Sequence, residues 1–232
     1  AQDPDICQDW LEHLFVRKMY LETEISPDNF LDVGGIVSDR LSNSLDDADI
    51  QSAHEVFFKY LEIQPALLGQ AHDFCRASDI GEHTLGVHYR GTDKYLETPR
   101  TEFETMRLAV EAQVNKASFL NIFIATDEPK FLAYMRATFS KHLIVDLACK
   151  EIYGGDRPPH ITPGDGLVKG REALLTIVVL SMCGHCIRTS SYLSAWSKIL
   201  NPKLDTTLIT DVNDAMSLPF PDNILWHPSC KS

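Results

Sequence analysis

The segment ALLTIVVLSMCGHCIRTSSYLSAW, residues Ala173–Trp196, passes from a helix through a strand into a second helix. Its first part is apolar apart from Thr176, which predicts a buried helix over residues 168–182. GHCIRTS, residues 184–190, then predicts a strand, and SYLSAWSKIL, residues 191–200, predicts a helix. A strand enclosed between two helices is typical of α/β folds.

The same alternation extends to both sides of this segment. Further strands are predicted at residues 84–89, 119–125, 142–147 and 206–210, and further helices at residues 102–117 and 128–140. Strands alternating with helices form βαβ units, whose strands are parallel and whose helices cover both faces of the sheet. We therefore predict an α/β fold with a Rossmann-like doubly wound parallel sheet in residues 80–232.

Residues 1–79 have a different pattern. A helix is predicted at Trp10–Tyr20, and an acidic, irregular stretch follows it. Apolar residues then recur at helical spacing on both sides of Pro65, which divides two predicted helices. We expect residues 1–79 to form a mainly helical region that is distinct from the sheet domain.

Composition excludes some classes of protein. The formal net charge of −12 argues against a nucleic-acid surface and means that an anionic ligand needs a local group of bases. The longest apolar run, Leu174–Leu180, is too short to span a bilayer, so no transmembrane segment is predicted in this chain. No signal peptide is visible, and the six cysteines would allow three disulfides in an oxidising compartment. The compartment stays open.

Cys183-Gly184-His185-Cys186 matches the active-site tetrapeptide of protein disulfide isomerases. In thioredoxin-like domains this motif opens a helix, whereas here it ends one, where the partial negative charge of the helix disfavours a thiolate. We predict that both thiols are buried and structural. The alternative function, a thiol–disulfide oxidoreductase, is supported by this motif alone. A zinc site would need a second pair of ligands, and none is evident, so no metal is predicted.

Ligands of doubly wound sheets bind beyond the carboxyl ends of the strands. Here that rule selects the segments 89–94, 126–128 and 188–191, together with Asp146. The first segment contains two cations beside small polar residues, and 188–191 offers hydroxyl groups at the start of a helix, which is an anion-binding arrangement. A phosphate or diphosphate fits such an edge, although neither GxGxxG nor GxxxxGK[ST] is present.

GVHYRGTDK, residues Gly86–Lys94, resembles the H-x-R-x-T-D-K signature of the α1,6-fucosyltransferases, the family of the bacterial nodulation enzyme and the animal core fucosyltransferase. The resemblance continues through IFIATDEPKFL, residues Ile122–Leu132, and through Ala173–Trp196. It implies a GT-B fold with residues 1–79 as a reduced or partial acceptor-side lobe and 80–232 as the nucleotide-sugar-binding domain. It also implies GDP-fucose as donor substrate, a glycan acceptor, inversion at the anomeric carbon, and no metal or other cofactor.

The resemblance assigns roles to individual residues. Arg90, with Lys94, would bind the β-phosphate and stabilise the departing GDP, while the carboxylate of Glu97 would deprotonate the acceptor hydroxyl. The other residues expected to bind the donor are His88, Asp93, Thr126, Asp127, Arg188, Thr189, Ser190 and Ser191. A bacterial-type member would be cytoplasmic, and an animal-type member would lie in the lumen of the secretory pathway.

Two positions leave the donor and the chemistry open. Thr176 stands where the family has an Asp that reads guanine, so another donor base is an alternative, as is reading by Asp165 or Glu172. Glu97 is one position short of the spacing expected for the base. Glu102 and Glu104 are the alternatives for that role. A non-catalytic nucleotide- or glycan-binding module is therefore the second candidate, and the acceptor is not identified.

Several of these residues also have purely structural interpretations. Arg90 and Lys94 would then be a solvated pair on a loop, and His88 a core histidine. Asp127 ends a predicted strand and would then only cap the next helix.

Overall fold

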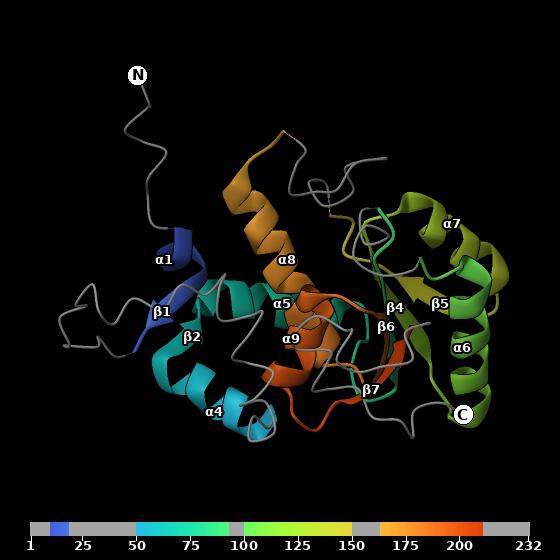
Figure 1. The fold of residues 1–232 in the computed structure, drawn as a ribbon, viewed down its shortest axis with the longest axis horizontal. Helices are drawn as coiled ribbons and strands as arrows, with labels where there is room; N and C mark the ends of the chain where they lie inside the picture. Colours follow the sequence, from blue (N-terminus) through green and yellow to red (C-terminus); the bar gives the residue numbers. More distant parts are fainter. Residues whose placement is uncertain (1–9, 19–49, 93–99, 150–162, 211–232) are drawn as a thin grey trace, which may run out of the picture.

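The computed structural model describes residues 10–18, 50–92, 100–149 and 163–210. Its centre is a five-stranded parallel sheet with the strand order β5-β4-β3-β6-β7 (Figure 1). The strands are β3 (Thr84–Tyr89), β4 (Asn121–Thr126), β5 (Leu143–Val145), β6 (His185–Thr189) and β7 (Asp205–Ile209). This order, in which the chain runs outward from the middle in one direction and then in the other, is that of a Rossmann-like half. The predicted α/β doubly wound fold is confirmed.

Helices cover both faces of the sheet, as Figure 1 shows. On one face α6 (Phe103–Lys116) and α7 (Pro129–Thr138) pack against Leu85 and Val87 of β3. On the other face lie α5 (Pro65–Ala77), α8 (Gly166–Ser181) and α9 (Tyr192–Leu200). Because side chains alternate along a strand, Gly86 and His88 of β3 point to this second face.

The strand register places the carboxyl ends of β3, β4 and β6 at one edge. His88 pairs with Ala125 of β4 on one side and with Arg188 of β6 on the other, and Tyr89 pairs with Thr126. The strand order reverses between β3 and β6, so the switch point of the sheet lies beside His88. The segments predicted to carry the site therefore meet in space.

The predicted helix Trp10–Tyr20 was wrong over residues 15–18, and its last two residues lie outside the described ones. Helix α1 ends at Leu14, and the next residues form β1 (Phe15–Arg17), which pairs antiparallel with β2 (Leu61–Ile63). Gln64, directly after β2, also contacts α1, because its Nε2 donates to the carbonyl of Glu12 at 2.6 Å. The pairing joins segments far apart in the sequence, and local periodicity carries no signal for it.

The two helices predicted around Pro65 are present as α4 (Ile50–Tyr60) and α5, with Pro65 in the first turn of α5. Phe57 of α4 and Leu67 of α5 belong to the same buried apolar cluster as Leu174 and Val178 of α8. The N-terminal helices thus share a core with the helices on the second face of the sheet.

The CGHC segment leads from α8 into β6, and its two cysteines are buried. Cys183 and Cys186 are free thiols with exposed fractions of 4% and 0%. Burial raises the pKa of Cys186 to about 12 and that of Cys183 well above its usual value. Among the described residues no group of His, Cys, Asp or Glu could hold a metal ion. In the same part of the chain, no helix has both the length and the apolar character to cross a bilayer.

Candidate functional site

A cavity of about 270 Å³ opens at the carboxyl edge of the sheet, on the face covered by α8. Its floor is formed by Phe123–Thr126 of β4 and Asp127 after it, with His88 of β3 and Arg90 directly after β3. The opposite wall comes from α8 and from the segment after β5. The residues from these parts and from α9 are Leu147, Cys149, Lys169, Gly170, Ala173, Thr176 and Leu193. The lining is largely apolar and includes the cations Arg90 and Lys169, which suits a ligand with a flat apolar part and an anionic part.

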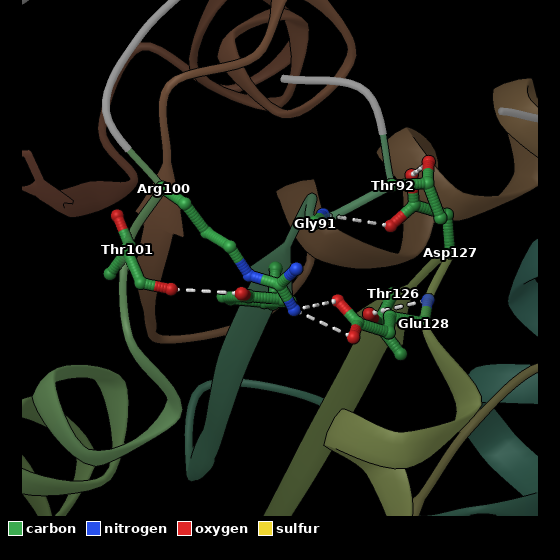
Figure 2. Close-up of polar contacts among 8 residues, drawn as sticks. Gly91, Thr92, Arg100, Thr101, Thr126, Asp127 and Glu128 are labelled. Carbon is green, nitrogen blue, oxygen red and sulfur yellow. Dashed lines mark hydrogen bonds and ion pairs between the residues drawn. The ribbon is translucent and has the colours of Figure 1, made fainter. Parts of the chain in front are cut away.

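The segment Arg90–Thr92 is fixed beside the cavity by Asp127 (Figure 2). The backbone N–H of Gly91 donates to Oδ1 of Asp127 at 3.0 Å, and the Thr92 hydroxyl donates to Oδ2 at 2.6 Å. Nε of Arg90 lies 3.5 Å from the same Oδ2. Asp127 does not cap the next helix, because the residue at the N-cap of α7 is Glu128. The capping interpretation of Asp127 is therefore wrong.

His88 lies at the floor of the cavity with 5% of its surface exposed. Burial, followed by the charges of Arg90 and Arg188, lowers the pKa of His88 to about 3, so the ring is neutral. Within the described part of the chain, Nδ1 of His88 has no hydrogen-bond partner. A buried polar atom left in this state favours a site that a ligand completes.

The hydroxyl-rich segment after β6 supports the site from the other side. Arg188, Thr189, Ser190 and Ser191 are buried and none of them lines the cavity. Oγ1 of Thr189 accepts a hydrogen bond of 3.0 Å from the backbone N–H of Arg90. Ser191 is the N-cap of α9, as its residue type predicts.

Helix α8 forms one wall of the cavity, and of its lining residues the sequence prediction named only Thr176. Thr176 lines the cavity and donates its hydroxyl proton to the carbonyl of Glu172 at 2.8 Å. Ala173 and Lys169, one and two turns before Thr176, line the cavity as well and were not predicted. Ala173 lies three residues and Lys169 seven residues before Thr176, and this helical spacing is the signal that could have found them. Asp165 is the N-cap of α8, and its Oδ1 accepts from the N–H groups of Leu167 and Val168. This carboxylate oxygen is therefore already hydrogen-bonded at the start of the helix.

The remaining candidates lie elsewhere or outside the described residues. Asp93, Lys94 and Glu97 are outside them. Glu104 accepts hydrogen bonds from Arg107 and from Tyr134, and it does not line the cavity. Of the predicted donor-binding residues, four line the cavity: His88, Arg90, Thr126 and Asp127.

Comparison with solved structures gives likenesses at low identity. One is a NodZ α-1,6-fucosyltransferase soaked with GDP-fucose, with 17% identity over 66% of this chain and 47% of that one, at a TM-score of 0.48. Fucosyltransferase NodZ from Bradyrhizobium has 18% identity over 64% of this chain and 46% of its own, at a TM-score of 0.46. A variant of Arabidopsis thaliana FUT1 in complex with GDP has 11% identity, with 76% and 40% covered and a TM-score of 0.48.

The chain spans about half the length of the NodZ structures that it matches. No protein-family model matches the sequence. A search of curated protein sequences found no match either. The function is therefore inferred from the residues that line the cavity.

Proposed function

We propose that this chain carries the nucleotide-sugar-binding half of a fucosyltransferase-like GT-B enzyme, with residues 80–232 as the donor domain and 1–79 as a reduced acceptor-side lobe. The observation that carries the proposal is Arg90, held at the carboxyl edge of a doubly wound sheet at the rim of a cavity of about 270 Å³. A nucleoside diphosphate fits this arrangement because its base needs an apolar wall and its phosphates need a fixed cation.

Arg90 would act on the leaving group. As the glycosidic bond breaks, negative charge grows on the β-phosphate, and a guanidinium already held in place stabilises that charge without reorganising. His88, neutral at the floor of the cavity, supplies a hydrogen-bonding atom rather than charge. Lys94 would assist Arg90, and Glu97 would accept the proton of the acceptor hydroxyl, so that inversion needs no metal.

The donor is proposed to be GDP-fucose, on the basis of the H-x-R-x-T-D-K segment that begins at His88. Thr176 lines the cavity where a carboxylate would read guanine, so a different nucleotide sugar is the alternative. The second candidate function is a nucleotide- or glycan-binding module without transfer. The shifted position of Glu97 favours it.

Thermal-shift titration with GDP, UDP, ADP and GDP-fucose tests nucleotide binding. A ligand at 100 times its Kd stabilises the folded state by about 2.7 kcal/mol, roughly 5–10 °C for a chain of this size. We expect guanine nucleotides to give the largest shift and Arg90→Ala to weaken their binding by about ten- to a hundredfold. Arg76→Ala is the matched control, because Arg76 is an exposed arginine of α5 that pairs with Asp73 and does not line the cavity.

No shift with any nucleotide would refute both the enzyme and the nucleotide-binding module. Transfer and donor hydrolysis, measured with and without EDTA, then separate the enzyme from the module. An enzyme turns over the donor in EDTA and loses turnover in Glu97→Gln. A module binds the nucleotide and leaves the donor intact.

A further inference from the structure

We propose that Asp127 and Glu128, adjacent carboxylates after β4, are positioning residues that hold Arg90 in the geometry for binding a diphosphate. This inference rests on the proposed function, because it assigns Arg90 to the donor phosphate. It gives Asp127 a different role from the direct donor contact expected from the sequence.

Between described residues, the hydrogen bonds and the ion pair of Asp127 go to the segment Arg90–Thr92. Its two oxygens accept from the Gly91 N–H and the Thr92 hydroxyl and lie 3.5 Å from Nε of Arg90. The side chain of Asp127 is 4% exposed, so these contacts are made away from bulk water. One carboxylate thus binds three consecutive residues, which fixes both the backbone of the segment and the direction of the guanidinium.

Charge argues against Asp127 as a phosphate ligand. Its oxygens already accept hydrogen bonds from the Gly91 N–H and the Thr92 hydroxyl. An ionised carboxylate repels a diphosphate, so its presence on the cavity wall needs another explanation. Orientation of Arg90 provides that explanation, since the guanidinium can bind a phosphate in a fork only when its plane is fixed.

Glu128 holds the neighbouring part of the site. Its two oxygens accept from Nη2 of Arg100 at 2.8 and 3.0 Å, as Figure 2 shows. The same carboxylate packs against Gly91: a Cβ at that position would lie 2.0 Å from Oε2 of Glu128 and 2.6 Å from the ring of Tyr89. A side chain at position 91 would therefore displace the Glu128 carboxylate, so this carboxylate and Asp127 both contact the backbone at Gly91.

Strand β6, the other neighbour of β3 in the sheet, also holds Arg90. Oγ1 of Thr189, at the end of β6, accepts from the backbone N–H of Arg90 at 3.0 Å. Arg90 is therefore held through its main chain by β6 and through its side chain by the residue after β4. Since β3 lies between these two strands, the cation is fixed beside the switch point of the sheet.

The experiment measures GDP affinity of the full chain by isothermal titration calorimetry. The variants are Asp127→Asn, Arg90→Ala and their combination, with Asp73→Asn as a control, because Asp73 is an exposed carboxylate of α5 that pairs with another arginine, Arg76. If Asp127 only repels the ligand, Asp127→Asn tightens binding. If Asp127 positions Arg90, Asp127→Asn weakens GDP binding by about tenfold or more. In the Arg90→Ala background the same change should then leave affinity equal or improved.

Each outcome decides the proposal. Tighter or unchanged binding by Asp127→Asn, with wild-type GDP binding intact, overturns the positioning role and leaves the proposed function standing. Absence of GDP binding by the wild-type chain overturns both. Circular dichroism checks that each variant is folded. If Asp127→Asn is unfolded, Glu128→Gln replaces it. The weaker binding of Glu128→Gln supports the proposal, and unchanged binding overturns it.

Discussion

At the scale of single residues, the site combines fixed positive charge with a histidine that does not titrate near neutral pH. Burial and the neighbouring Arg90 and Arg188 lower the pKa of His88 to about 3. The neutral ring can lie beside the two arginines without adding a third positive charge. It also keeps both a donor and an acceptor for a ligand.

The low pKa of His88 predicts a specific loss of stability in acid. The unfolded chain protonates His88 near pH 6.5 and the folded chain near pH 3, so the unfolded state binds more protons in between. Stability from this group is full above pH 6.5 and is lost as the pH falls towards 3. Relative to His88→Gln, the wild type should lose up to about 1.4 kcal/mol more per pH unit.

Urea titrations at pH 7, 6, 5 and 4 measure this difference. His83→Gln is the matched control, because His83 is exposed and immediately precedes β3. Its profile should run parallel to that of the wild type. A His88→Gln profile that is also parallel to the wild type would show that His88 is not kept neutral by the fold.

The buried thiols of the CGHC segment should be chemically inert. Burial raises the pKa of Cys183 and Cys186, and only the thiolate reacts. Alkylation by iodoacetamide at pH 8, resolved by site in a mass spectrometer, should be at least about a hundredfold slower in the native chain than in urea. Insulin reduction should be absent. Insulin reduction that disappears in Cys183→Ser would contradict the structural interpretation.

At the scale of elements, buried strands were predictable almost to the residue. TLGVHY corresponds to β3, from Thr84 to Tyr89, because a short apolar run in an α/β sheet is buried on both faces. The rule that ligands bind at carboxyl ends then selected Arg90 and Asp127 from the sequence, and the family resemblance added His88. These inferences depend on local pattern and on a general property of parallel sheets.

The parts that were missed depend on contacts between distant segments. The pairing of β1 with β2 joins residue pairs such as Phe15 and Ile63. The pattern within either three-residue strand does not predict this pairing. Cys149 and Lys169 line the cavity because of how the segment after β5 and α8 approach the sheet. Thr189 was expected at the phosphates, but its hydroxyl bonds to the backbone of Arg90. Packing and partner choice of this kind are tertiary properties.

Gly184 within CGHC should be intolerant of substitution for steric reasons. A Cβ there would lie 1.9 Å from the carbonyl oxygen of Glu82, a backbone atom that cannot rotate away. We expect Gly184→Ala to lower the free energy of unfolding by about 2–3 kcal/mol. Urea denaturation measures this, with Gly81→Ala as the control, because no atom lies within 4 Å of a Cβ at Gly81. Equal midpoints for the two variants would refute the steric explanation.

At the scale of the whole molecule, the N-terminal helices pack against the helices on the second face of the sheet. The ring of Phe57 in α4 lies 5.6 Å from that of Trp196 in α9, in an edge-to-face arrangement. Helix α9 begins directly after Ser191, at the edge of the site. A change in the N-terminal region should therefore be felt in the sheet domain, and the two regions should unfold together.

Phe57→Ala tests this coupling. Phe57 is 9% exposed and also packs against Phe15, so its truncation should lower the free energy of unfolding by about 3–4 kcal/mol. Because the lost contacts join both regions, unfolding should remain a single transition, with circular dichroism and hydrogen exchange of β6 amides changing together. Val56→Ala is the control: Val56 is adjacent in α4 but 58% exposed, so its effect should stay within about 0.5 kcal/mol. The contrary outcome is an early unfolding transition confined to residues 1–79, with unchanged hydrogen exchange of the β6 amides. It would mean that the N-terminal region folds independently of the sheet domain.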